Sequence, residues 1–239
     1  MSSTGRSDLL VETGDLPVPM EIRPLRNARR LRLRFDDARG VLKLTCPAGM
    51  SRRKAVAWAV GQREWVLAQI SRAPQPEPFV PGAVIPLCGE EIRLVWRADA
   101  PRSPQRIGSD LLCGGPESGF ERRIASYLKQ LALETMAADV SDFAAVAAVH
   151  PSAVGVGDAS SRWGSCSSDR RIRLSWRLIM APAAVRRYVA AHEVAHLVHL
   201  DHSAAFKSLE AQLFGVGLAA AKADLRRIGP RLRLLGRRR

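Results

Sequence analysis

Residues 188–206 read YVAAHEVAHLVHLDHSAAF and contain four of the five histidines in this chain of 239 residues. His192 and His196 are four residues apart, so in a helix they lie on the same face, one turn from each other. Two imidazoles in this arrangement are able to hold one Zn²⁺ at about 2.0–2.1 Å from each nitrogen. Glu193 lies about 100° further around the helix, where its carboxylate reaches a metal-bound water. The H-E-x-x-H pattern therefore predicts two metal ligands and a general base.

A third metal ligand is expected downstream of this pair. His202 follows His196 by six residues, which is the spacing of the metzincin pattern, where the chain turns at a glycine. His199 stands at the position of that glycine, and histidine tolerates the left-handed region better than most residues. We predict His202 as the third ligand. His199, which an unbroken helix would present on the ligand face, and Glu210, on the next predicted helix, remain the alternatives.

The composition excludes several classes of protein. Hydrophobic residues make up 46% of the chain and charged residues 25%, which are ordinary values for a globular protein and rule out wholesale disorder. No run of eighteen apolar residues is present, and the start of the chain lacks the apolar segment of a signal peptide. The four cysteines are widely spaced, with no C-x-x-C pair. We therefore expect a cytoplasmic protein that does not insert into a membrane.

The charge is strongly positive and unevenly distributed. The net charge is +14, with six arginines between residues 23 and 34 and seven between residues 226 and 239. Such a field attracts polyanions, including nucleic acids. Residues 30–35 alternate basic and apolar side chains, which indicates a half-buried strand that pairs with residues 41–45 as a hairpin. On this interpretation the arginines are the solvated face of the strand, and a nucleic-acid-binding surface is the alternative.

The predicted organisation has four parts: a disordered leader over 1–17, a β-rich region over 18–115, an α+β domain over 116–230 and a basic tail over 231–239. In the β-rich region we expect one helix over 51–70, with Trp58 and Trp65 in the core, and strands at 83–88 and 91–97 after a proline-rich break at 73–78. In the α+β domain, apolar periodicity and capping residues predict helices at 120–136, 184–199, from 203 and at 218–227, and strands at 153–156 and 171–176.

Three blocks of the sequence resemble the YgjP-like zinc metallopeptidases, which are related to the SprT and WLM groups. The blocks are SRWGSCS at 161–167, IRLSWRLI at 172–179 followed by Ala181-Pro182, and the histidine-rich stretch at 188–206. The resemblance implies an α+β fold with a minimal zincin-like core, in which a small sheet packs on the H-E-x-x-H helix. It implies one Zn²⁺ per chain, held by His192, His196 and His202. One departure is Lys207, where family members usually carry tryptophan.

The first block contains three residues whose roles we predict from their residue types. Arg162 either has a functional role, in which it binds an anionic group of the substrate or stabilises developing negative charge, or forms a structural ion pair. Trp163 is expected to fill the core beneath the helix, and Cys166 to be a buried thiol.

These observations predict a zinc-dependent metallohydrolase, and a metallopeptidase first of all, in which Glu193 activates a zinc-bound water. Its substrate would be a peptide, a protein or a small anionic molecule. The alternatives are a hydrolase of nucleotide phosphoanhydrides, a DNA-associated SprT-like protease and a non-catalytic module stabilised by zinc.

Overall fold

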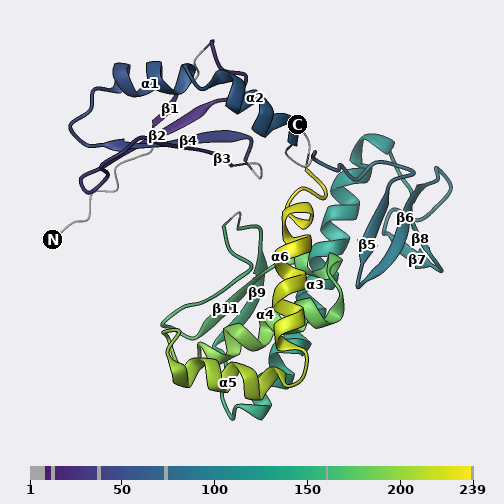
Figure 1. Cartoon of the computed structure of the whole chain (residues 1–239). Coiled ribbons are helices and arrows are strands. Elements are labelled where there is room, and N and C mark those ends of the chain that lie inside the picture. Colours follow the sequence, from purple (N-terminus) through teal and green to yellow (C-terminus); the bar gives the residue numbers. More distant parts are fainter. Residues whose placement is uncertain (1–8, 12–13, 37–38, 73–74, 160, 238–239) are drawn as a thin grey trace. The chain divides into compact units, whose positions relative to one another are not determined.

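The computed structural model describes residues 9–11, 14–36, 39–72, 75–159 and 161–237 (Figure 1). The chain forms two compact units, residues 1–75 and 76–239, and each combines helices with small sheets. The predicted α+β class is therefore confirmed at this level. Among the described residues, no helix has both the length and the apolar character that a membrane crossing requires.

The first unit is a four-stranded sheet with two helices on one side (Figure 1). The strand order is β1-β2-β4-β3, and β2 and β4 are parallel while the outer pairs are antiparallel. The elements are β1 (Leu9–Val11), β2 (Met20–Leu25), β3 (Arg32–Asp36), β4 (Val41–Pro47), α1 (Arg52–Val60) and α2 (Arg63–Arg72). The predicted hairpin of residues 30–35 and 41–45 is confirmed as β3 and β4. Its apolar face packs on α1 and α2 through a small core.

Three predictions for this unit differ from the structure. The helix expected over 51–70 is two helices, because the chain turns at Gly61, whose N–H bonds back to the carbonyl of Ala57. Trp58 and Trp65 are 36% and 40% exposed, so they are not core residues. The leader predicted over 1–17 is ordered where the structure describes it, since β1 pairs with β2 and Leu16 is buried. Residues 1–8 and 12–13 lie outside the described part.

The second unit contains two sheets and the remaining helices. The strands β5 (Val84–Leu87), β6 (Glu90–Trp96), β7 (Gln105–Ile107) and β8 (Asp110–Cys113) form one sheet, and β9 (Ala153–Gly157), β10 (Gly164–Cys166) and β11 (Arg171–Ser175) form the other. The helices are α3 (Phe120–Val146), α4 (Ala183–Ala195), α5 (Ala204–Phe214) and α6 (Leu218–Leu232), with short 3₁₀ turns at Glu117–Gly119 and Trp176–Met180. A single core joins both sheets to α3 and α4.

The domain boundary predicted at 115/116 is therefore misplaced, and the compact units divide at 75/76. Strands β5 to β8 bury Ile85, Leu94 and Leu111 in the same core as α3. The division falls within the proline-rich segment at 73–78. Residues 73 and 74 themselves lie outside the described part of the chain.

The segment predicted as a basic tail is part of the fold. Helix α6 continues through Pro230 to Leu232, and Leu232, Leu234 and Leu235 are buried. Leu235 forms a parallel bridge with Glu77, and the carbonyls of Leu232 and Leu235 accept hydrogen bonds from the buried guanidinium of Arg177. The sequence did not indicate this burial, because Arg231 and Arg233 alternate with Leu232 and Leu234. Residues 238 and 239 are not described.

A buried ion pair fixes helix α4 on helix α3. Arg186 Nε donates to Asp139 Oδ2 at 2.6 Å, and Arg187 Nη1 donates to Asp139 Oδ1 at 2.9 Å. The side chains of Arg186 and Asp139 are only 9% and 6% exposed. Because α4 carries His192 and Glu193, this pair sets the position of the histidine-rich stretch relative to the core.

Candidate active site

Helix α4 ends at Ala195, earlier than the predicted end at residue 199, and the chain turns directly after it. The last helical residue is Ala195, and His196 is the C-cap. The carbonyl of Ala195 then accepts hydrogen bonds from the N–H groups of Val198 and His199. In the described residues, positive φ angles outside glycine occur at Cys88, Ala148 and Arg170, so His199 turns the chain without entering the left-handed region. Helix α5 begins after Ser203, whose Oγ accepts from the N–H of Phe206.

The turn brings His202 back to His192 and His196. One ring nitrogen from each of the three histidines lies within 4.8 Å of the other two. The Nε2 atoms of His192 and His202 are 3.4 Å apart. All three rings contact the buried ring of Phe206, with centroid distances of 5.1, 4.5 and 4.9 Å. Phe206 thus forms the apolar wall beside the histidines, while Lys207, the residue that departs from the family pattern, is exposed.

The two alternative ligands have other positions and other roles. Glu210 is 2% exposed, and its Oε1 lies 2.7 Å from His192 Nδ1. Its Oε2 accepts from Lys222 Nζ at 2.6 Å. Burial alone would raise the pKa of Glu210, but the hydrogen bonds from Lys222 and His192 hold it below its usual value. The backbone carbonyl of His199, and not its ring, lies 3.0 Å from His196 Nδ1.

These contacts set the orientation of two imidazoles. With Nδ1–H donating to Glu210 in one case and to the His199 carbonyl in the other, His192 and His196 each keep an unprotonated Nε2 for a ligand. Metal-binding histidines in proteins are held in this way. Burial lowers the pKa of His196, which favours the neutral ring that a metal requires.

The carboxylate of Glu193 is buried beside the three histidines. The residue is 4% exposed, and burial raises its pKa to about 7, against a smaller lowering by the charge of Arg162. Its Oε2 has no hydrogen-bond partner among the described residues. A buried carboxyl oxygen without a partner is costly. A carboxyl group whose pKa lies near neutrality is able both to accept and to return a proton.

Strand β10 packs directly against this carboxylate, which explains Gly164. A Cβ atom on Gly164 would lie 2.3 Å from Glu193 Oε1, so only glycine allows the backbone to come this close. No strand was predicted between the strands at 153–156 and 171–176, so neither β10 nor this contact was expected from the sequence. A glycine inside a strand-like segment was the available signal.

Arg162, Trp163 and Tyr188 line a cavity of about 210 Å³ next to His192 and Glu193. A second cavity of about 300 Å³ shares Arg162 and Trp163 and adds Arg173 and Asp158. Arg162 is exposed at the junction. Trp163 is half-buried, packs against the core and contacts the guanidinium of Arg233 at 4.3 Å. Cys166, expected to be buried, is half-exposed.

The histidine cluster fits a zinc ion. Four tetrahedral ligands at about 2.0–2.1 Å from a metal lie about 3.3–3.4 Å from one another, and the His192 and His202 nitrogens are 3.4 Å apart. The candidate donors are imidazole nitrogens, which suit zinc and neighbouring transition metals. The structure therefore brings together the three histidines and the glutamate that the sequence singled out, and it leaves Glu210 and the His199 ring outside the cluster of three histidines.

A comparison with protein families identifies the family of this chain. The family model described as YgjP-like, metallopeptidase domain matches residues 29–227. The chain belongs to the YgjP-like metallopeptidase family. The match includes the three histidines, Glu193 and Gly164, and it begins inside the first compact unit. Searches of curated proteins and of solved structures found no match to this chain. Membership of this metallopeptidase family confirms the resemblance seen in the sequence and implies a metal-dependent hydrolase.

Proposed function

We propose that this YgjP-like protein is a zinc-dependent peptidase whose metal is held by His192, His196 and His202 and whose general base is Glu193. The observation that carries the proposal is the convergence of three histidine nitrogens beside a buried glutamate with an unpartnered oxygen. A structural zinc site would need neither that glutamate nor the cavity next to it, because structural sites are closed by a fourth protein ligand.

His192, His196 and His202 would hold the zinc ion through one ring nitrogen each. Zinc in such a site is a Lewis acid that lowers the pKa of a coordinated water to about 7 and polarises a carbonyl group. Glu210 and the His199 carbonyl hold the rings of His192 and His196 in position. Lys222 balances the charge of Glu210, so the carboxylate remains an acceptor for the His192 N–H.

Glu193 carries the proton in this mechanism. Its carboxylate accepts a proton from the attacking water, and the new C–O bond forms at the scissile carbonyl carbon. The same carboxyl then donates that proton to the amine nitrogen as the C–N bond breaks. The pKa of about 7 suits both steps near neutral pH. Arg162, an exposed residue that lines the cavity, would bind a carboxylate of the peptide or stabilise the negative charge of the tetrahedral state.

The test is hydrolysis of a mixed pool of fluorogenic, internally quenched peptides by zinc-loaded protein. We expect Glu193→Gln to lower the rate by about 10²–10⁴-fold while the bound zinc remains. Glu117→Gln is the matched control, because Glu117 is exposed and lies outside the site, and it should keep the wild-type rate. Equal rates in wild type and Glu193→Gln would refute the proposed base.

A second candidate reaction is hydrolysis of a nucleotide phosphoanhydride at the same site. The observation that favours it is the pair Arg162 and Arg173, which line the adjoining cavity of about 300 Å³ and offer guanidinium groups that suit phosphate oxygens. Release of phosphate or diphosphate from nucleoside triphosphates, measured with the same variants, decides between the two substrates. Activity on nucleotides and none on peptides would replace the peptidase assignment and leave the roles of the histidines and Glu193 unchanged.

A further inference from the structure

Six arginines of the first unit form a surface that the metal site does not use. They occupy β2, the following turn and β3, and we call them the basic face: Arg23, Arg26, Arg29, Arg30, Arg32 and Arg34. All six are exposed. Within the described part of the chain, none of them makes a hydrogen bond or an ion pair with another side chain.

The strand register places three of these arginines on the same side of the sheet. Thr45 in the middle strand β4 is paired with Arg23 on one side and with Arg32 on the other. Residues paired in this way point to the same face, and alternate residues along a strand share a face, so Arg34 joins them. The guanidinium-bearing residues therefore repeat about every 6.6 Å along β3 and about 10 Å across the sheet.

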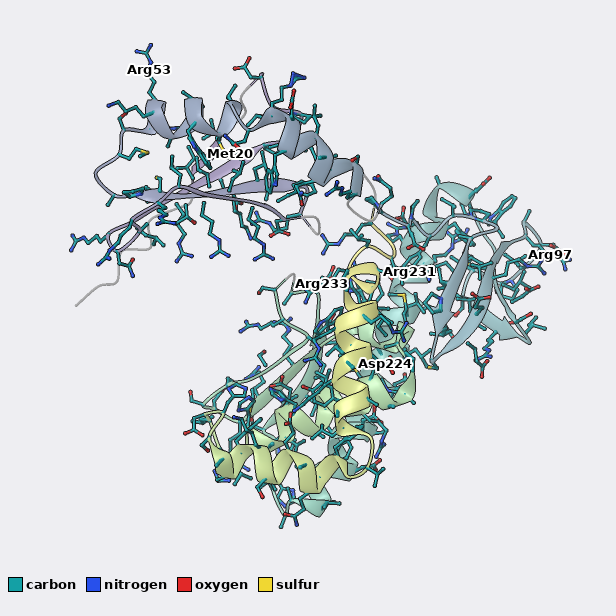
Figure 2. The ribbon with its side chains drawn as sticks, in the orientation of Figure 1. Met20, Arg53, Arg97, Asp224, Arg231 and Arg233 are labelled. Atoms are coloured by element: carbon teal, nitrogen blue, oxygen red, sulfur yellow. The ribbon has the colours of Figure 1, made fainter. Side chains whose placement is uncertain are left out.

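The opposite face of the sheet is the covered one. Leu33 and Phe35 alternate with the arginines of β3 and pack into the core with α1 and α2. In Figure 2, Met20 lies between the sheet and the helices, and Arg53 points away from the far side of α1. Nitrogen-tipped side chains extend from the side of the sheet turned away from the helices. No described element of residues 9–72 covers that side.

Two described acidic residues beside the basic face are bound to cations other than its six arginines. Glu21 is bound by both terminal nitrogens of Arg39, at 3.0 and 2.5 Å, and Asp36 accepts from Lys43 Nζ at 2.6 Å. Both carboxylates are therefore already paired with other cations. Residues 1–75 contain fourteen basic and seven acidic residues, so less than a third of the chain carries half of the net charge.

The chemistry of the face favours phosphate over other anions. Arginine binds phosphate through paired N–H groups, and Lys43, which lies opposite Arg34 on the same side of the sheet, is already paired with Asp36. The large apolar side chains exposed in this unit, Trp58, Trp65 and Leu67, belong to α1 and α2, so the basic face has no described apolar group to insert into a membrane. It also has no described exposed aromatic ring on which a base could stack. Contacts would therefore be with the backbone of a nucleic acid.

We propose that the basic face binds the phosphate backbone of a nucleic acid without sequence preference. This function is separate from the proposed peptidase reaction, since none of the six arginines belongs to the metal site. Binding that rests on phosphate contacts falls steeply with salt, because each contact releases counterions. It also varies little with sequence, because phosphates carry no base information.

The test is fluorescence anisotropy of a fluorescein-labelled, mixed-sequence DNA duplex with the full chain at increasing KCl concentrations. The first variant is Arg23→Gln/Arg32→Gln/Arg34→Gln. The matched control is Arg52→Gln/Arg53→Gln/Arg63→Gln, which removes the same charge from exposed positions on α1 and α2. We expect the slope of log K against log salt to become shallower by about three in the first variant and to stay at the wild-type value in the control.

Two further variants keep the test decisive. Arg26→Gln/Arg29→Gln lies in the turn outside the strands and should make the slope shallower by about two even if the triple variant folds poorly. Glu193→Gln should bind the duplex as the wild type does. Equal losses in the control and the first variant would overturn the proposal in favour of diffuse charge attraction. Binding to phosphatidylserine vesicles without binding to the duplex would overturn it in favour of a membrane surface.

Discussion

Removal of the Asp139 side chain should destabilise the second unit severely. Asp139 is the only acidic partner that the described structure gives to Arg186, and both side chains are buried. In Asp139→Ala, the guanidinium of Arg186 stays in the core without its counterion. Loss of one partner of a buried ion pair costs about 3–5 kcal/mol. We expect a decrease of that size in the free energy of unfolding.

The control comes from the same ion-pair network. Arg187 also contacts Asp142 at 2.9 Å, but the Asp142 side chain is 60% exposed. An exposed pair contributes about 0–1 kcal/mol, so Asp142→Ala should change stability little. The two variants remove the same kind of group three residues apart on α3, and they differ in burial.

Urea unfolding followed by tryptophan fluorescence measures the difference. A background of Trp58→Phe and Trp65→Phe leaves fluorescence from tryptophans of residues 76–239 alone, so the transition reports on the second unit. A loss of less than about 1 kcal/mol in Asp139→Ala would refute the argument that this pair is buried and holds α4 in place.

Other predictions concern the C-terminal segment, acid stability and the approach of β10 to Glu193. Leu235→Ala should lower the free energy of unfolding by about 2–5 kcal/mol, since Leu235 is fully buried; a loss near zero would show that the segment is a free tail. Burial opposes ionisation of Asp158, but Arg177 holds the pKa of Asp158 below its usual value. The contribution of Asp158 to stability is therefore complete above the unfolded pKa of about 3.9 and is lost as the pH falls through the folded pKa. Asp158→Asn should thus be less stable than wild type in neutral urea titrations and equal to it in strong acid, and a constant difference would contradict this assignment. Gly164→Ala should retain zinc but lose peptidase activity, because the added methyl group displaces the Glu193 carboxylate, and unchanged activity would be evidence against that contact.

The site residues that could be predicted from the sequence are those whose spacing along the chain fixes their relative positions. His192, Glu193 and His196 follow from the helical period alone. His202 follows from a turn whose length is known from other zinc proteases, although here the turn uses no left-handed residue. Glu210 was considered as a ligand, and its actual place beside His192 Nδ1 depends on how α5 packs on α4, which no local pattern encodes.

The features that were missed depend on contacts between distant segments. Strand β10 has no alternation of apolar residues, and its pairing with β11 defines it. The boundary was predicted at 115/116, between the β-rich region and the α+β domain, yet β5 to β8 and α3 share one core. Lys222 and Asp139 likewise have partners that are twelve and 47 residues away, beyond the reach of periodicity.

The most direct test of the proposed metal site is the zinc content of purified, folded protein by elemental mass spectrometry. We predict one zinc per chain in the wild type, in Glu193→Gln and in His199→Ala, because only the backbone carbonyl of His199 contacts the site. His202→Ala should lose zinc or bind it far more weakly. Zinc retained in His202→Ala and lost in His199→Ala would contradict the three-histidine assignment, and a folded wild type that stays metal-free when zinc is supplied would contradict the account as a whole.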